Sequence, residues 1–288
     1  ELPEPTNHFV KHPMPVYPKK MLDLISDPSS VTEIDLRGMD LTSLPKEVFQ
    51  CVNATTANLE NNDLSDLPDD FFKLIKLERL YLGGNTGFSN FDKRFSKLIN
   101  LKELYIGALH NNGLYAVNQY QVLSLDKSLG QLTKLEKLSI EGNFENGSMP
   151  NFIFQLQNLK LLSVKTTSVS KSINPSLEKL KCKSTLEILE LGILNSLDNF
   201  NRNIGAFTNL KSISIETINE KTSPKGILNV KDLKYSKAMV WVKNTNSSSY
   251  SGKTVIDLSS WGWSSKAYTK NEKLEGLAKW TKFMKTNN

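Results

Sequence analysis

One apolar motif recurs along most of the chain, and this repetition constrains the fold more than any other feature of the sequence. The motif has the form L-x-x-L-x-L, and successive copies begin 23, 23, 24, 34, 24, 27 and 24 residues apart. The eight copies start at Val31, Ala54, Leu77, Leu101, Leu135, Leu159, Leu186 and Leu210. Such a period predicts a repeat architecture, in which each unit packs mainly against its neighbours along the chain.

Alternation within the motif predicts a short β-strand in every repeat. In "LERLYL" from Leu77 and "LKELYI" from Leu101, apolar and polar residues alternate, so the leucines share one face of the strand. One such strand cannot bury its apolar face alone. Stacked copies can, because their strands then form a parallel sheet that covers a continuous core.

The second half of each repeat returns the chain to the next strand. A proline that precedes a pair of large apolar residues suits the first turn of a short helix or 3₁₀ segment. Such prolines stand at Pro45, Pro68 and Pro150. Asparagines recur in the turns that follow three of the strands, at Asn62, Asn85 and Asn143. We expect their buried amides to satisfy backbone groups of adjacent repeats.

These strings and their spacing resemble the leucine-rich repeat family, in the 23–24-residue form of plant receptors and bacterial proteins, over about Val31 to Leu228. The resemblance implies an α/β fold, a curved solenoid with a parallel sheet on its concave face and short helical or 3₁₀ segments on its convex face. Three regions are then expected: an N-terminal arm with a capping helix at 1–30, about eight repeats at 31–230, and a C-terminal cap of two strands and an amphipathic helix at 231–288.

Two tyrosines occupy one column of this expected concave face. Tyr81 and Tyr105 hold the same position in adjacent repeats, so their strands should lie about 4.8 Å apart. Arg79 and Glu103 stand two residues earlier in the same strands. Exposed aromatic residues and arginines are enriched at binding hot spots, so we predict a partner-binding site here. The alternative interpretation is a cross-strand pair that only stabilises the sheet.

Other residues extend the predicted site along the solenoid. Leu161, Ile188 and Ile193 form an expected apolar patch on the same face. The 34-residue step adds about ten residues within 109–123, and an insertion of this kind is either functional or a neutral addition at the solenoid edge. The complete set predicted to bind a partner is Arg79, Tyr81, Glu103, Tyr105, Tyr115, Tyr120, Lys137, Leu161, Ile188 and Glu190.

Catalytic and metal-binding patterns are not found in the sequence. No nucleophile stands with a supporting base, and no cofactor motif is present. His8 and His12 have i, i+4 spacing, but they stand in a proline-rich arm that is not expected to form a helix, so no metal site is expected. Cys51 and Cys182 lie five repeats apart, about 24 Å at the spacing of strands, so we expect free, buried thiols. Bacterial effector ubiquitin ligases have a similar N-terminal architecture, but 231–288 contains no cysteine that could serve their chemistry. We therefore predict that the chain is not an enzyme.

Charge and composition limit the partners. Residues 231–288 hold 11 Lys against 4 Asp and Glu, a net charge of +7. The whole chain carries +6, so residues 1–230 sum to −1. Solvated lysines on a cap explain this better than nucleic-acid binding. No run of about 18 apolar residues occurs, so no transmembrane segment is expected. Because the chain starts at Glu1 rather than Met, we expect an exported bacterial protein, extracellular or attached to the cell surface, with a cytoplasmic location left open.

The function predicted from these features is recognition without catalysis. We expect a monomeric module that binds a protein partner through the concave face of the solenoid. The alternative is binding of a surface polysaccharide, with the same tyrosines as stacking platforms for sugar rings.

Overall fold

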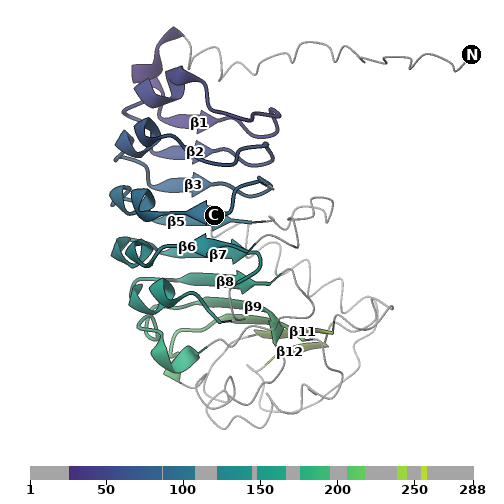
Figure 1. Cartoon of the computed structure of the whole chain (residues 1–288). Helices are drawn as coiled ribbons and strands as arrows, with labels where there is room; N and C mark the ends of the chain where they lie inside the picture. Colours follow the sequence, from purple (N-terminus) through teal and green to yellow (C-terminus); the bar gives the residue numbers. More distant parts are fainter. Residues whose placement is uncertain are drawn as a thin grey trace, which may run out of the picture.

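Strands stacked along one axis dominate the computed structural model of the chain (Figure 1). The structure describes residues 26–85, 87–107, 122–144, 148–166, 176–194, 206–217, 239–244 and 254–257. One ten-stranded sheet runs through these ranges in the order β1-β2-β3-β5-β7-β8-β9-β10-β11-β12, and a second sheet pairs β4 with β6. Every pairing is parallel except that of β11 with β12.

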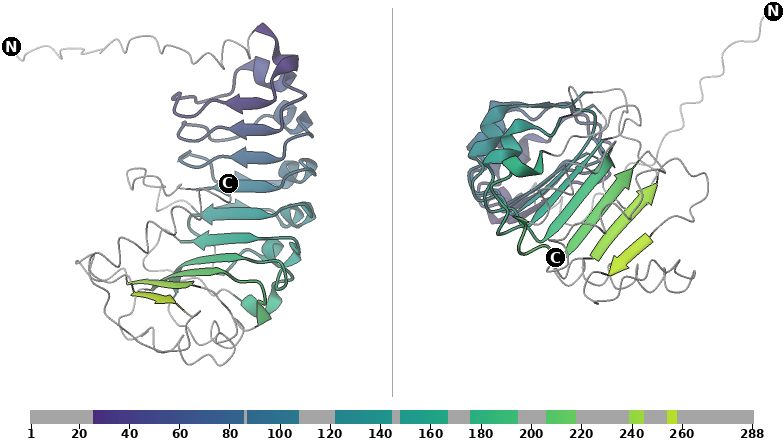
Figure 2. Two further views of the ribbon diagram at one scale, coloured as in Figure 1. Left: turned by 180° about the vertical axis from the view of Figure 1, so that it is seen from behind. Right: turned by 90° about the horizontal axis from the view of Figure 1, so that it is seen from below.

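The strands of the large sheet are β1 (Glu33–Asp35), β2 (Thr56–Asn58), β3 (Arg79–Tyr81), β5 (Glu103–Ile106), β7 (Lys137–Glu141), β8 (Leu161–Lys165), β9 (Ile188–Leu194), β10 (Ser212–Thr217), β11 (Met239–Asn244) and β12 (Thr254–Asp257). The small sheet consists of β4 (Asn90–Phe91) and β6 (Ser124–Leu125). The 3₁₀ helices are η1 (Pro28–Ser30), η2 (Lys46–Gln50), η3 (Asp69–Lys73), η4 (Lys93–Lys97), η5 (Lys127–Gln131), η7 (Asn151–Gln155) and η8 (Leu177–Lys179). They lie along the side of the solenoid opposite the large sheet, which makes the predicted α/β leucine-rich repeat solenoid the observed fold (Figure 2).

The register between strands is the one that the motif predicts. Tyr81 pairs with Tyr105, and Asn58 pairs with Tyr81, so residues at equivalent motif positions face each other across the sheet. The column that contains Tyr81 and Tyr105, and the neighbouring column that contains Arg79 and Glu103, continue without a shift in register from β1 to β9. A one-residue slip would turn every leucine out of the core, which is why the alternation specifies the register.

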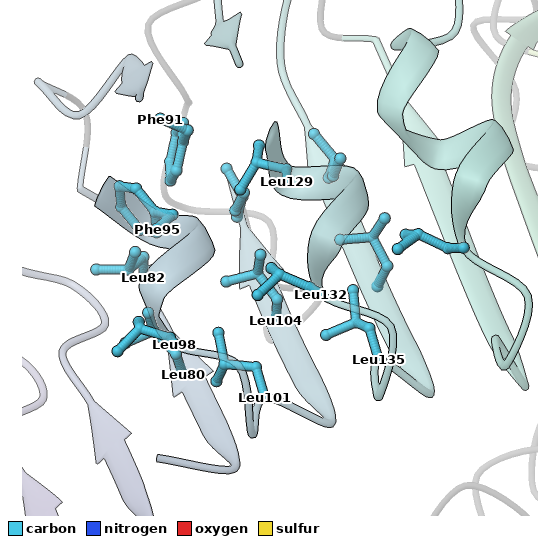
Figure 3. Close-up of a cluster of buried hydrophobic side chains, with 14 of the residues drawn as sticks. Leu80, Leu82, Phe91, Phe95, Leu98, Leu101, Leu104, Leu129, Leu132 and Leu135 are labelled. Carbon is cyan, nitrogen blue, oxygen red and sulfur yellow. The ribbon is translucent and has the colours of Figure 1, made fainter. Parts of the chain in front are cut away.

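Leucines of the strands and apolar residues of the return segments form one continuous core. Figure 3 shows Leu80 and Leu104 of adjacent strands beside Leu98, Leu101 and other side chains that follow the 3₁₀ helices. These leucines have no exposed surface, and neither does Leu138 in the next strand. Burial of such a side chain contributes roughly 1.5–3 kcal/mol, so the core is the main source of stability.

Proline and aspartate begin the 3₁₀ helices. Pro45, Pro68 and Pro150 lie immediately before η2, η3 and η7, one residue earlier than the predicted first turn. Aspartates hold the same position before η4 and η5. Asp92 accepts a hydrogen bond from the backbone nitrogen of Arg94, and Asp126 accepts one from that of Ser128, both at 2.8 Å. Both residue types suit a helix start, the first because its fixed φ is already compatible and the second because its carboxylate caps a free N–H.

The predicted role of the turn asparagines is confirmed for Asn62 and Asn85. Asn62, which is 3% exposed, accepts from the backbone nitrogens of Met39 and Leu41 and donates to the carbonyl oxygens of Leu36 and Leu59. Asn85 makes the same kind of bridge one repeat later and accepts from the nitrogen of Leu64 at 3.0 Å. Each amide therefore joins the turns of two repeats.

A second series of asparagines, which we had not identified from the sequence, lies just before the strands. Asn53, Asn100 and Asn158 each donate at 2.8 Å to a backbone carbonyl oxygen of the preceding repeat. Asn53 and Asn158 are exposed and Asn100 is partly exposed, unlike the buried turn asparagines. The repeats are thus cross-linked by side-chain amides at two separate places.

Several predicted features fall outside the described residues. They are the N-terminal arm with most of its capping helix, the insertion within 109–123, and the C-terminal amphipathic helix. Two strands are present in the predicted cap, and β11 pairs with β10 across the expected boundary between 230 and 231. The three regions remain predictions. Among the described residues, no helix has the length and apolar character that crossing a membrane requires.

Candidate functional site: the concave face at β3 and β5

The rings of Tyr81 and Tyr105 stack on the concave face of the sheet. Their centroids are 5.0 Å apart and their planes differ by 26°. Both side chains are partly exposed, and the Tyr81 hydroxyl donates a hydrogen bond to Oε2 of Glu103 at 2.9 Å. The contact follows from the register, because paired residues on adjacent strands bring their side chains to the spacing at which rings can stack.

Charged groups surround the tyrosine pair. Oε1 of Glu103 lies 3.2 Å from Nζ of Lys137, so this carboxylate joins the hydroxyl of Tyr81 to a lysine on β7. On the other side, Nε of Arg79 donates to Oγ1 of Thr56 at 2.9 Å. The structure therefore brings together Arg79, Tyr81, Glu103, Tyr105 and Lys137, half of the residues that the sequence predicted.

The pKa of each tyrosine hydroxyl lies above its usual value. Burial raises the pKa of Tyr81, and the negative charge of Glu103 and the hydrogen bond to it raise this pKa further. Burial also raises the pKa of Tyr105, and Glu103, Glu190 and Glu60 add to the shift in that order. The shared cause is a partly desolvated site with several carboxylates, where a phenolate would be unfavourable.

The expected apolar patch further along the solenoid differs from the structure. Leu161 and Ile188 are 8% and 7% exposed, so they do not present an open apolar surface. The expectation was wrong because it assumed that the face turned away from the core is open to solvent at every strand. All five residues of β8 are buried, so this strand is covered on both faces. Nothing about the side chain of Ile193 is described.

Glu190, also predicted to face solvent, is 6% exposed and paired with two neighbouring side chains. Its Oε2 accepts from Oγ of Ser163 at 2.9 Å and lies 3.3 Å from Nζ of Lys165. A buried carboxylate is tolerated when it is paired and hydrogen-bonded, and this one is. Tyr115 and Tyr120, the remaining predicted residues, lie outside the described residues.

Glu60 belongs to the same face and was missed in the sequence. It follows Asn58 by two residues, so continuing the alternation past the end of the motif would have placed it there. The residue is 7% exposed, and its Oε1 has no hydrogen-bond partner. Burial raises the pKa of its carboxyl group, whereas hydrogen bonding by Asn58 and the charge of Arg37 lower it.

The described residues show no arrangement for metal binding or thiol chemistry. Within them, no group of three or more His, Cys, Asp or Glu side chains is placed to hold a metal ion. Cys51 and Cys182 are free and buried, as predicted. Burial raises the pKa of both thiols to about 11, so they are protonated and unreactive at neutral pH.

Two solved structures are similar to this chain. A leucine-rich repeat protein of Leptospira interrogans matches with a TM-score of 0.54 and 23% sequence identity, over 79% of this chain and 57% of that chain. The leucine-rich repeat ectodomain of the plant membrane receptor kinase GASSHO1/SCHENGEN3 from Arabidopsis thaliana, in complex with CASPARIAN STRIP INTEGRITY FACTOR 2, matches with a TM-score of 0.38 and 18% identity, over 65% of this chain and 22% of that chain.

No protein-family model and no curated protein matches the sequence. The chain spans little more than half the length of the Leptospira chain, at 57%. At 23% identity this likeness is one of fold. Together with the repeat motif and the parallel sheet, it confirms the resemblance: this is a leucine-rich repeat protein by fold.

Proposed function

We propose that the chain is a non-enzymatic recognition module that binds a protein partner through the concave face at β3 and β5. The observation that carries the proposal is the stacked, partly exposed pair of Tyr81 and Tyr105 among charged side chains. Aromatic residues supply large contact areas with few rotatable bonds, and such residues dominate the binding energy of protein interfaces.

The surroundings of the tyrosines favour a protein over a polysaccharide. Each ring already uses one of its faces to contact the other ring, so neither tyrosine offers two free faces to sugars. Glu103, Lys137 and Arg79 provide fixed charges of both signs at the edge of the pair. A protein surface can complement such a pattern, and electrostatic complementarity of this kind gives interfaces their specificity.

The test is a double substitution of the pair. Parallel protein-array and glycan-array screens with the purified chain would first supply a binder, whose affinity is then measured for the wild type and for Tyr81→Ser/Tyr105→Ser. Each tyrosine that acts as a hot spot contributes about 2 kcal/mol or more, so the affinity should fall at least about thirtyfold. The melting temperature should change by only a few degrees, because both rings lie outside the core.

Ser139→Ala is the matched control, because Ser139 is partly exposed and pairs with Tyr105 in the same column. It should leave the affinity unchanged. Normal protein binding by a folded double variant would refute the proposed site, and binding confined to glycans would refute the class of partner. The proposal also includes an exported or surface-attached location and a monomeric chain, which cell fractionation and analytical ultracentrifugation would check.

A further inference from the structure

Glu60 is a buried carboxylate with an unsatisfied oxygen on the proposed binding face. It is 7% exposed, and its Oε1 has no hydrogen-bond partner. Only one other side-chain atom among the described residues, Oγ of Ser128, shares this condition. Most buried polar groups in proteins are hydrogen-bonded, and an unsatisfied charged one is more costly than a neutral hydroxyl. Folding of the chain alone therefore does not explain why this carboxylate is buried.

Neighbouring cations on this face are already engaged. Arg37 forms two bonds of 2.9 Å with the carboxylate of Asp35. Lys137 pairs with Glu103, and Lys165 pairs with Glu190. Arg79, described above, donates to a hydroxyl. Each of these cations thus has a closer partner on the face. Glu60 forms no ion pair among the described residues, and the nearby charge of Arg37 only lowers the pKa of its carboxyl group.

Two glycines follow Glu60 at the same position of the next repeats. The parallel ladder continues past the strands, where the nitrogen of Asn61 donates to the oxygen of Gly83 and the nitrogen of Gly84 donates to the oxygen of Gly107. Glu60, Gly83 and Gly107 therefore hold equivalent positions in successive repeats. The two glycines carry no side chain, so within its own column Glu60 has a side-chain neighbour on one side only, Arg37.

Glu60 lies diagonally beside the tyrosine pair on the sheet, two residues after Asn58, the strand partner of Tyr81. The negative charge of Glu60 contributes to the raised pKa of Tyr105, whose ring stacks on that of Tyr81. Carboxylate oxygens and the faces of aromatic rings both bind ammonium and guanidinium ions in proteins. A cation placed here would satisfy Glu60 and contact the rings at the same time.

We propose that Glu60 and the pair of Tyr81 and Tyr105 form a subsite for one basic side chain, lysine or arginine, of a protein partner. The inference rests on the proposed function and specifies the chemistry of the partner at that site. A neutral hydroxyl or an amide could also donate to Glu60, but neither would neutralise its charge or attract the ring faces as strongly.

The test selects binders without assuming a partner. Random linear peptides displayed on phage are selected on the whole chain, and the selected peptides are then synthesised. We expect them to be enriched in lysine or arginine at one position. Replacing that residue by norleucine should weaken binding to the unaltered chain about tenfold or more, the loss expected for a charge-assisted contact.

The second arm changes the chain. Glu60→Gln keeps the size of the side chain and removes its charge, and we expect a comparable, about tenfold, loss of affinity for the same peptides. The matched control is Glu178→Gln, which makes the same charge change at an exposed residue of η8, on the opposite side of the solenoid from the sheet. Circular dichroism would confirm that both variants are folded.

The outcomes separate the two proposals. Peptides that depend on the tyrosines but show no basic residue, or that bind equally well to Glu60→Gln, would overturn the subsite and leave the binding face intact. Peptides that bind independently of Tyr81 and Tyr105 would overturn the binding face and the subsite with it. Basic peptides that lose affinity with Glu60→Gln and retain it with Glu178→Gln would establish both.

Discussion

The side-chain nitrogen of Asn62 donates to the carbonyl oxygen of Leu36 at 2.8 Å, although 26 residues separate them in the chain. The same amide also accepts hydrogen bonds from two backbone nitrogens and donates one to the carbonyl oxygen of Leu59. A single side chain therefore satisfies several backbone groups of a turn in which the hydrogen bonds between strands have ended. Backbone groups buried in such a turn would otherwise lack partners.

Asn62→Ala should therefore reduce stability strongly. The substitution leaves several buried backbone groups without partners, each at a cost of about 1–3 kcal/mol, so the free energy of unfolding should fall by about 2 kcal/mol or more. Urea denaturation would measure it. Asn151→Ala, at an exposed position of η7, should change the value by less than about 0.5 kcal/mol. Similar effects of the two substitutions would mean that water replaces the amide at Asn62.

Adjacent residues of β7 test the register of the sheet. Leu138 is fully buried and Ser139 is partly exposed. Leu138→Ala should lower the free energy of unfolding by about 2–5 kcal/mol, through lost burial and the cavity that remains. Ser139→Ala should change it by less than about 0.5 kcal/mol. Chemical denaturation of both variants is the measurement, and equal losses would contradict the alternation of faces.

Gly107 is a position where only glycine fits. Its φ is +103°, and a Cβ atom there would lie 2.2 Å from the carbonyl oxygen of Glu141 in the next repeat. Gly107→Ala should destabilise the chain by about 2 kcal/mol or more, since backbone strain and the clash add. Gly38 also has a positive φ, +64°, but a Cβ atom there meets nothing within 4 Å. Gly38→Ala should cost about 1 kcal/mol from strain alone, so thermal unfolding of the two variants separates the contributions.

Stability should depend on pH through Glu60. Burial raises the pKa of its carboxyl group in the folded chain, so the folded state binds this proton more tightly than the unfolded state does. The resulting destabilisation is absent below the pKa of the unfolded chain and develops as the pH rises through the pKa of the folded chain. At neutral pH, Glu60→Gln should raise the melting temperature by a few degrees, the shift expected for about 1 kcal/mol in a chain of this size.

The advantage of Glu60→Gln should disappear when the melting curves are recorded near pH 4, where the wild-type carboxyl group is protonated. Glu178→Gln, the exposed control, should show little difference at either pH. A constant difference between Glu60→Gln and the wild type across the whole range would mean that packing, rather than charge, is responsible.

The sequence alone determined the fold and the order of residues on each face. Spacing placed the strands, and alternation assigned Tyr81 and Tyr105 to one column of the concave face, as the register confirms. This succeeded because both properties are one-dimensional: a strand alternates strictly, and each repeat packs against its neighbours in the chain. The turn asparagines were predictable for the same reason, since their partners lie one repeat away.

Exposure on that face was decided only by the tertiary structure. Alternation turns Glu60, Leu161, Ile188 and Glu190 away from the core in the same way as Tyr81, yet these four are buried and Tyr81 is partly exposed. The alternation of apolar and polar residues predicts which side of the sheet a residue occupies, but it does not predict which other groups cover that side. Burial depends on groups brought together in three dimensions, and burial is also what raises the pKa of Glu60 and makes its unsatisfied oxygen significant.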